Sequence, residues 1–521
     1  MTSPASPIEE QDNKHFARRW LALGVLSLAL FMASLDNTIL NVALPTLAKE
    51  LQASTGQLQW TVDSYQVTFA GLLLVAGAFV DRWGRTKTFL TGAGVFGLFS
   101  LLAGLAPNVE LLIVFRALMG IGAALLTPST LALVSAIFHE PKERTLAFAI
   151  WSGANAAGGA AGPLLSGILL EHFSWGSIFF INVPVALIIV IAGPFVLQHF
   201  KPDSSLKGID IVGALLSTIA LALVCWTVIS APGFGLLSAP IIISAVLGLA
   251  LMIGFVSWEA NFSEPILDLS LFKNRRFSVA VSVAGLVTGG GSAALFILTQ
   301  YLQFNLAYDP LESGIRILPV AVALGIGVFS APKLISSLKL KNTVLIGLVF
   351  VASGFFWMSF VTVESTYSHM LIGALAFGIG AGLLNPAATQ AVMDALPQWA
   401  SGVGSATNSS LMQVGSAMGV AFGGALLSTR YQNTVANSSI FEQLGEWKQA
   451  VLDSYAGAVN AADHFTGPLG EKIIYLAKAG FVEGMSWALI GCGAAVTVSA
   501  IAVAVLYPSD KKSKEISDDA E

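Results

Sequence analysis

Long runs of apolar residues, separated by short polar segments, recur along almost the whole chain. A membrane-spanning helix needs roughly 20 apolar residues, so the spans can be counted from these runs. The first six predicted spans begin near Trp20, Leu58, Thr88, Leu111, Leu146 and Gly176. The later spans occupy 209–229, 238–258, 278–303, 312–336, 342–363, 369–393, 401–428 and 485–507. The pattern predicts an all-α polytopic membrane protein with 14 transmembrane helices, in groups of six, two and six.

The grouping of the spans predicts how the chain is organised. Two six-helix bundles are joined by two inserted linker helices. The predicted units are a cytoplasmic tail 1–19, a first bundle 20–200, linker helices 201–262, a second bundle 263–507 and a cytoplasmic tail 508–521.

The longest connection, 431–484, contains FEQLGEWKQAVLDSYAGAV. Its large apolar residues recur at helical spacing between Phe441 and Tyr455. We expect this loop either to fold onto the outer mouth of the protein or to form a mobile surface hairpin.

The composition supports a membrane protein and narrows its functions. Hydrophobic residues make up 55% of the chain and charged residues only 11%, which is too few charged residues for the surface of a soluble protein. No basic tract suggests nucleic-acid binding, and the two cysteines, Cys225 and Cys492, both lie in apolar segments. The six histidines fall in loops, tails or helix ends, and neither HExxH nor GxSxG occurs. We therefore expect neither an enzyme nor a metal or cofactor site.

The lysines and arginines predict the orientation in the membrane. With the N-terminus inside, 19 of the 26 basic residues face the cytoplasm and five face outward, while Arg116 and Arg316 lie within spans. Cytoplasmic loops are enriched in lysine and arginine, so both termini are predicted to be cytoplasmic. The first span is too long for a cleaved signal peptide and is expected to remain.

The segment after the second predicted span reads GAFVDRWGRTK. Positive-inside charge and a turn glycine would explain it in the simplest way. Its pattern also resembles the loop signature of the major facilitator superfamily, which implies a charged latch between two bundles. The residues concerned are Gly77, Asp81, Arg82, Gly84 and Arg85.

Two further segments are similar to signatures of this superfamily. RALMGIGAALLTP resembles its fourth-helix pattern, with Met119 in place of the usual glutamine, and implies a proton-relay role for Arg116 rather than an interfacial anchor. ANAAGGAAGPLLSGI could be only a stripe of small residues for tight packing. It also resembles the fifth-helix signature of exporters, with Ser166 as a departure, and so implies outward transport. The matching residues are Gly158, Gly162, Pro163 and Gly167.

The first span contains FMASLDNTILNVALP, which is similar to the pattern of the fourteen-helix drug:proton antiporters. An aspartate in lipid costs several kcal/mol, so Asp36 is a functional candidate. Asp36 points about 160° away from the stripe of Ser34, Asn37, Thr38 and Asn41, and either face could meet a cavity. Asp36 could hold the helix to its neighbours through Arg116, or it could bind proton and cargo in competition.

Other intramembrane polar residues are candidates for the cargo cavity. Trp60, Asp63 and Gln66 share one sector of the second span, which would place an aromatic wall beside a carboxylate and suit a lipophilic cation. Asp63 could instead be merely interfacial. The candidates in the second bundle are Gln300, Tyr301, Asn408 and Gln413. For Arg316 a helix cap at Asp309 and an ion pair with Glu312 provide a structural explanation, with a transport role as the alternative.

The resemblance implies a monomeric, proton-driven exporter of lipophilic, cationic drugs in the bacterial inner membrane, working by alternating access on small molecules and protons. No GxxxxGK[ST] motif for ATP is present. The alternative within the same fold is an exporter of an endogenous metabolite, an antibiotic or a lipid-like compound. A receptor or scaffold would have no need for the fifth-helix signature.

Overall fold

The computed structural model describes residues 18–138, 140–197, 210–262, 265, 267, 269–394, 401–465 and 468–507. Within these residues the chain is helical and contains no strand, which confirms the predicted all-α class. The first bundle comprises α2 (Arg19–Glu50), α3 (Thr55–Trp83), α4 (Arg85–Gly104), α5 (Val109–Ile137), α6 (Pro141–His172), α7 (Ser177–Phe180) and α8 (Asn182–Val196). The linker helices are α9 (Ile211–Phe234) and α10 (Ala239–Asn261).

The second bundle begins after the short 3₁₀ helix η1 (Leu269–Lys273). It comprises α11 (Arg275–Gln300) with its π-helical extension η2 (Tyr301–Asn305), α12 (Pro310–Leu338), α13 (Leu340–Ser359), α14 (Tyr367–Asp394), α15 (Ser401–Ala436) and α18 (Pro468–Leu506). Between α15 and α18 lie η4 (Phe441–Trp447), α16 (Lys448–Asp453) and α17 (Tyr455–Ala462).

Long helices occur at every position where the sequence predicts a span. In the described part of the chain, 12 are long and apolar enough to cross a membrane. The more polar α3 and α6 are 29 and 32 residues long but do not reach that criterion, so the count of 14 spans stays a prediction. Two helices continue well beyond the limits of the predicted spans: α15 runs to Ala436, and α18 begins at Pro468, whereas its predicted span begins near residue 485. Both helices extend beyond the apolar run that marked them.

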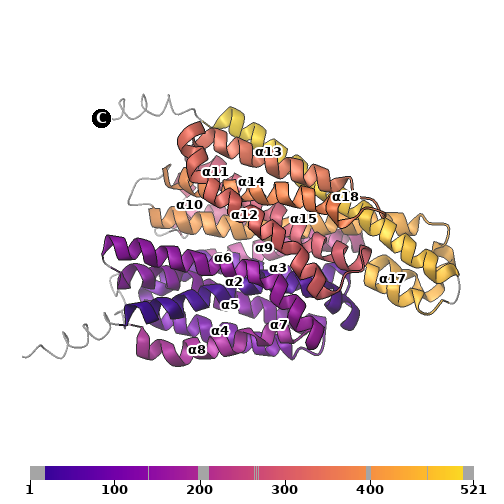
Figure 1. Cartoon of the computed structure of the whole chain (residues 1–521), viewed down its shortest axis with the longest axis horizontal. Helices are drawn as coiled ribbons and strands as arrows, with labels where there is room; N and C mark the ends of the chain where they lie inside the picture. Colours follow the sequence, from indigo (N-terminus) through magenta and orange to yellow (C-terminus); the bar gives the residue numbers. More distant parts are fainter. Residues whose placement is uncertain are drawn as a thin grey trace, which may run out of the picture.

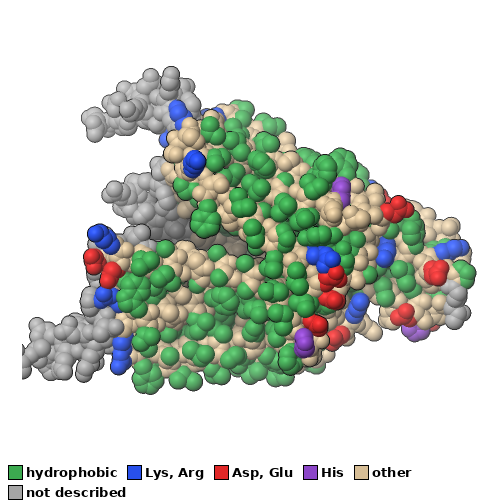
Figure 2. Space-filling model, in the orientation of Figure 1, with side chains coloured by type: hydrophobic (Ala, Val, Ile, Leu, Met, Phe, Trp, Pro, Cys, Tyr) green, Lys and Arg blue, Asp and Glu red, His purple; other side chains and the backbone are tan. Residues whose placement is uncertain are grey.

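The two bundles lie side by side, and the described chain ends lie at the same end of the molecule (Figure 1). We call this the terminal end and the opposite one the distal end. Figure 2 shows apolar side chains over the middle of the visible face, with charged side chains gathered toward the two ends. This distribution fits a molecule whose middle lies in lipid.

The loop between α15 and α18 folds onto the distal end, as one of the two interpretations of its sequence predicts (Figure 1). Leu444 and Val451 are buried, and the hydroxyl of Tyr455 donates to the carbonyl of Phe304 at 2.9 Å. The helical spacing is interrupted at Gly445, where φ is +56°, and at Ser454, which caps α17. The segment with helical spacing therefore folds as three short helices, η4, α16 and α17, and not as one continuous helix.

Candidate coupling site in the first bundle

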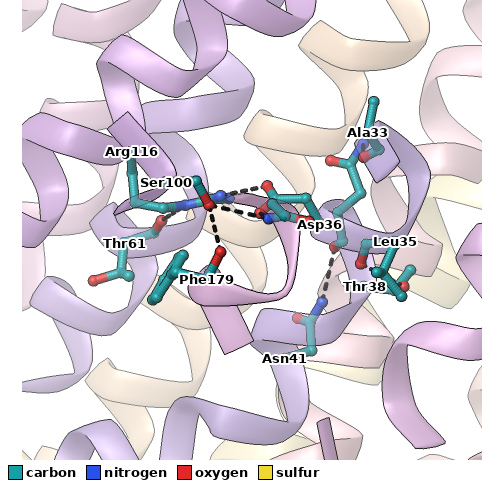
Figure 3. A network of polar contacts seen from close by, with 11 residues as sticks. Ala33, Leu35, Asp36, Thr38, Asn41, Thr61, Ser100, Arg116 and Phe179 are labelled. Carbon is teal, nitrogen blue, oxygen red and sulfur yellow. Dashed lines mark hydrogen bonds and ion pairs between the residues drawn. The ribbon is translucent and has the colours of Figure 1, made fainter. Parts of the chain in front are cut away.

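The centre of the first bundle holds an ion pair between α2 and α5. Arg116 Nη1 donates to Asp36 Oδ2 at 2.5 Å, and the two residues are 1% and 0% exposed (Figure 3). Arg116 Nε donates to the carbonyl of Thr61 on α3 at 3.1 Å. The guanidinium carbon lies 4.5 Å from the centre of the Tyr65 ring, close enough for a cation–π interaction. The sequence separates Asp36 from Arg116 by 80 residues, and the fold joins them.

Two further polar residues extend this site. The amide of Asn182, at the start of α8, donates to Asp36 Oδ1 and to Ser100 Oγ, both at 3.1 Å. Ser100 Oγ donates in turn to the carbonyl of Phe179 at 2.8 Å (Figure 3). Both carboxylate oxygens of Asp36 are thereby bonded. We call Asp36, Arg116, Asn182, Ser100 and Tyr65 the coupling site.

Sequence reasoning missed Asn182, Ser100 and Tyr65. Asn182 and Ser100 are polar residues inside apolar runs, which is a signal for function in a membrane helix. Their distance along the chain from Asp36 hid the connection, because helical periodicity identifies a face but not its partner.

The polar stripe of α2 faces away from the coupling site. Ser34 Oγ donates to the carbonyl of Asn155 at 2.7 Å, and Thr38 Oγ1 donates to that of Gly159 at 3.0 Å. The stripe therefore contacts α6, while Asp36 points into the first bundle. The structure settles which neighbour each face of this helix meets.

The small residues of α6 serve two contacts. A Cβ at Gly158 or Gly162 would overlap α2, at the carbonyl of Phe31 and the hydroxyl of Thr38. Farther along α6, the contact changes to α12 of the second bundle. A Cβ at Gly167 would lie 2.5 Å from Cα of Leu311, and one at Gly314 would meet the carbonyl of Pro163. The small residues of this signature thus allow α6 to pack against α2 within the first bundle and against α12 of the second bundle.

The three candidates on α3 lie buried or half-buried among neighbouring helices. Asp63 is 0% exposed, and neither of its carboxylate oxygens has a partner among the described residues. Trp60 packs against a buried cluster that contains Cys225 of α9 and Ala421 of α15. Gln66 is buried as well. Asp63 therefore lies inside the protein, and its depth in the membrane stays a prediction.

Side-chain amides join the bundles near the distal end. Gln59 Nε2 donates to the carbonyls of Val420 and Ala421 on α15 at 3.2 and 3.1 Å. Gln303 Nε2 donates to the carbonyl of Val42 on α2 at 2.7 Å. Backbone carbonyls therefore hold the two bundles together at this end.

The candidates in the second bundle are dispersed. Gln300 bonds the carbonyl of Phe296 within its own helix, and the hydroxyl of Tyr301 donates to the carbonyl of Ser365. Asn408 is buried and Gln413 half-buried on α15. These four residues do not converge on one point.

The segment between α3 and α4 forms the predicted tight turn. Gly84 has a φ of +94°, which favours glycine, and Thr88 Oγ1 donates to its carbonyl at 3.1 Å. Arg85 Nη1 donates to the carbonyl of Ala132 at 3.4 Å, and Arg82 is exposed. A Cβ at Gly77 would have no neighbour within 4 Å, so this glycine makes no close helix contact with the described residues. The side chain of Asp81 lies outside what the structure describes.

The structural explanation for Arg316 is confirmed. Asp309 caps α12 by accepting from the Glu312 amide at 2.6 Å, and Arg316 Nη1 lies 2.6 Å from Glu312 Oε1. The Arg316 guanidinium also stacks 3.9 Å above the ring of Tyr308. These contacts hold the start of α12.

Two helical bundles that join at one end, with a buried charged site inside the first of them, form the architecture of a secondary transporter. The chain belongs to the Major Facilitator Superfamily, whose sequence profile matches residues 26–420. Solved structures agree on the fold: a bacterial homologue of the human lysosomal transporter Spinster, in an inward-facing and unoccupied conformation, has a TM-score of 0.66 at 16% identity. That match covers 94% of this chain and 98% of the other.

Relatives with described activities point to export. The multidrug efflux pump LfrA of Mycolicibacterium smegmatis is 31% identical over 94% of this chain and 96% of its own. The methyl viologen resistance protein SmvA of Salmonella typhimurium is 32% identical over 93% and 97%. The tetracenomycin C resistance and export protein of Streptomyces glaucescens is 30% identical over 93% and 90%. These relatives support a multi-pass efflux transporter rather than an enzyme.

Proposed function

We propose that the chain is a monomeric, proton-driven exporter of lipophilic cationic drugs, with its terminal end in the cytoplasm. The observation that carries this proposal is the fully buried Asp36–Arg116 pair, whose atoms lie 2.5 Å apart. A buried ion pair is a poor device for stability alone, because removing two charges from water is costly. We infer that the role of the Asp36–Arg116 pair is to respond to protonation.

A proton on Asp36 would cancel one charge of the pair. Arginine stays protonated in proteins, so Arg116 would then be a buried cation without its counterion. An unpaired buried charge costs several kcal/mol, and the bundle would have to rearrange to relieve it. Thr61 and Tyr65 provide the remaining contacts of Arg116. Proton arrival would in this way bias the alternation between the two conformations.

The burial of Asp36 favours a proton over a large cation as its ligand. Asp63, which lacks a hydrogen-bond partner in the described structure, is the better candidate to balance a cationic cargo. The tetracenomycin C relative supports the second candidate function, export of an antibiotic or other natural product. Both functions predict the same dependence on the proton gradient.

The turn between α3 and α4 is proposed to act as a latch. Asp81 and Arg85 would hold the bundles in one orientation without touching cargo. Asp81→Asn should then lower turnover and leave cargo binding unchanged. A loss of binding with normal conformational exchange would contradict a latch.

Everted membrane vesicles energised by respiration test the proposed function, with ethidium as the cationic probe. We expect accumulation that collapses when a protonophore is added, and an Asp36→Asn variant that inserts normally but does not accumulate ethidium against a gradient. Asp36→Glu is the matched control and should keep part of the activity with a shifted pH profile. Accumulation that survives the protonophore would contradict proton coupling. A response only to neutral hydrophobic compounds would contradict the cationic cargo.

A further inference from the structure

The two bundles meet along two seams, one between α3 and α15 and one between α6 and α12. We propose that the linker helix α9 seals the first seam, and that the second seam is a portal through which lipophilic cargo enters from the bilayer. This inference rests on the proposed export function. It adds the route of the cargo and a role for a linker helix.

The α3–α15 seam is covered along much of its length. Ile229 of α9 would lie 3.4 Å from a Cβ at Gly56, near the distal end of α3. Fifteen residues farther along α3, a Cβ at Gly71 would overlap Thr218 of α9. On the other side of the seam, Cys225 Sγ lies 3.9 Å from Met418 Sδ of α15. Helix α9 therefore contacts both bundles at once.

Asp63 provides a physical reason for this cover. It lies on α3 between Gly56 and Gly71, the two glycines that face α9, and its oxygens have no hydrogen-bond partner in the described part of the chain. An ionisable side chain in contact with acyl chains is strongly unfavourable. Helix α9 carries no Asp, Glu, Lys or Arg from Ile211 to Phe234 and presents an apolar outer face. It separates the carboxylate from lipid.

Among the residues that the structure describes, no helix covers the α6–α12 seam in this way. The helices touch in their distal halves, at Gly167 and Gly314. Toward the terminal end they diverge: a Cβ at Gly153 of α6 or at Gly325 of α12 would find no atom within 4 Å, and Ala156 is exposed. Figure 2 shows the corresponding hollow between the bundles. The hollow opens on the face formed by α6 and α12 (Figure 1).

The edges of the hollow suit a molecule dissolved in lipid. No Asp, Glu, Lys or Arg occurs from Leu146 to Leu170 on α6 or from Ile317 to Pro332 on α12. Exposed Ser152 and Asn155 offer hydrogen-bonding groups on α6 without net charge. Because these edges carry no charged side chain, an amphiphilic molecule with a flat apolar body could pass between them without removing water from a charged group of the protein.

A lipid-contact experiment tests the portal without any cargo. Single-cysteine proteins in nanodiscs are labelled with a lipid-soluble fluorescent maleimide, and quenching by brominated acyl chains is measured. The portal probe is Ala156→Cys and the lipid-facing reference is Ile253→Cys on α10, both without the native cysteines; the sealed-seam probe is native Cys225 with Cys492→Ser. We expect Ala156→Cys to label and be quenched like the reference, and buried Cys225 to react at least about tenfold more slowly. Comparable reactivity of Cys225, or quenching of Ala156→Cys by aqueous iodide alone, would overturn the proposal.

A kinetic experiment uses the same seams. Gly153→Leu and Gly325→Leu should narrow the portal, and Gly254→Leu on α10 is the matched control, because a Cβ at each of the three glycines meets no atom within 4 Å. The rates are measured in nanodiscs without a gradient. We expect both the binding and the release of ethidium to be about tenfold slower in the portal variants. The equilibrium affinity should stay unchanged, because both rates fall by the same factor. Unaltered rates in both portal variants would overturn the portal. If ethidium binds to none of the proteins, the cationic-cargo proposal fails, and the lipid-contact experiment still decides the portal.

Discussion

The interiors of the two bundles are built from different chemistry. In the first, α2 and α5 are joined through Asp36 and Arg116 with Asn182 beside them. In the second, α11 and α15 approach so closely that a Cβ at Gly419 would overlap the backbone of Gly289. Among the described residues, every buried acidic or basic side chain lies in the first bundle or the linker helices.

This difference indicates that two bundles of similar fold have different roles. Small residues allow backbones to pack closely in lipid, where no hydrophobic force drives helices together. The contact between Gly289 and Gly419 is formed by backbone atoms and contains no ionisable group. A polar contact between the same two helices is neutral and joins the hydroxyls of Ser292 and Ser416 at 2.6 Å. Proton sensitivity is therefore expected to reside in the first bundle.

The substitution with the largest expected effect on the contrast between the bundles is Arg116→Ala, which removes the cation of the buried pair. Asp36 would then be a buried carboxylate without its cation, and we expect a loss of about 3–5 kcal/mol in the free energy of unfolding. Denaturant unfolding of the purified protein in detergent measures this. The double variant Asp36→Asn/Arg116→Gln should recover part of the loss because it removes both charges. A double variant that is no more stable than Arg116→Ala would contradict a paired site.

Asn182→Leu tests the outer part of the coupling site. It removes a donor to a buried carboxylate, and hydrogen bonds to charged groups contribute roughly 1.5–3 kcal/mol. Because the lost bond favours the charged form of Asp36, the pH profile of ethidium export should also shift upward. Ser100→Ala is the control, since Ser100 does not touch the carboxylate directly. Identical pH profiles for wild type and Asn182→Leu would count against a coupling role.

In the second bundle, Gly419→Ala tests packing without charge. The added methyl group meets the backbone of Gly289, and overpacking costs about 1–3 kcal/mol. The pH profile of transport should not move, in contrast to Asn182→Leu. Gly491→Ala, where the added Cβ would be 3.0 Å from a flexible Leu426 side chain, should cost less. A shifted pH profile in Gly419→Ala would erase the contrast between the bundles.

Tyr65→Phe should have the smallest effect. The Tyr65 hydroxyl is buried and has no partner within the described structure, while its ring stacks on Arg116. Phenylalanine keeps the ring, so we expect a change within about 0.5 kcal/mol. Tyr65→Leu removes the ring and should cost about 2 kcal/mol, the value of a desolvated cation–π contact. Equal effects of the two substitutions would mean that the ring face is unimportant.

The sequence alone was enough to predict the helical class, the position of every long helix and the cap and ion pair of Arg316. Each of these depends on neighbours within a few residues or on a run of apolar side chains, so local physics decides it. The spacing of small residues on α6 likewise predicted close packing. It did not say that the packing partner changes from α2 at Gly158 to α12 at Gly167.

Only the tertiary structure decided the chemistry of the site. A helical wheel separates Asp36 from the stripe of Ser34 and Thr38, but either face could have met a cavity. The fold turns Asp36 toward Arg116 and Asn182, 80 and 146 residues away along the chain. It also places α9 over Asp63, which a pattern of apolar residues cannot foresee. Periodicity fixes the angle between side chains on one helix, whereas the partner of each face is set by packing between helices distant in the chain.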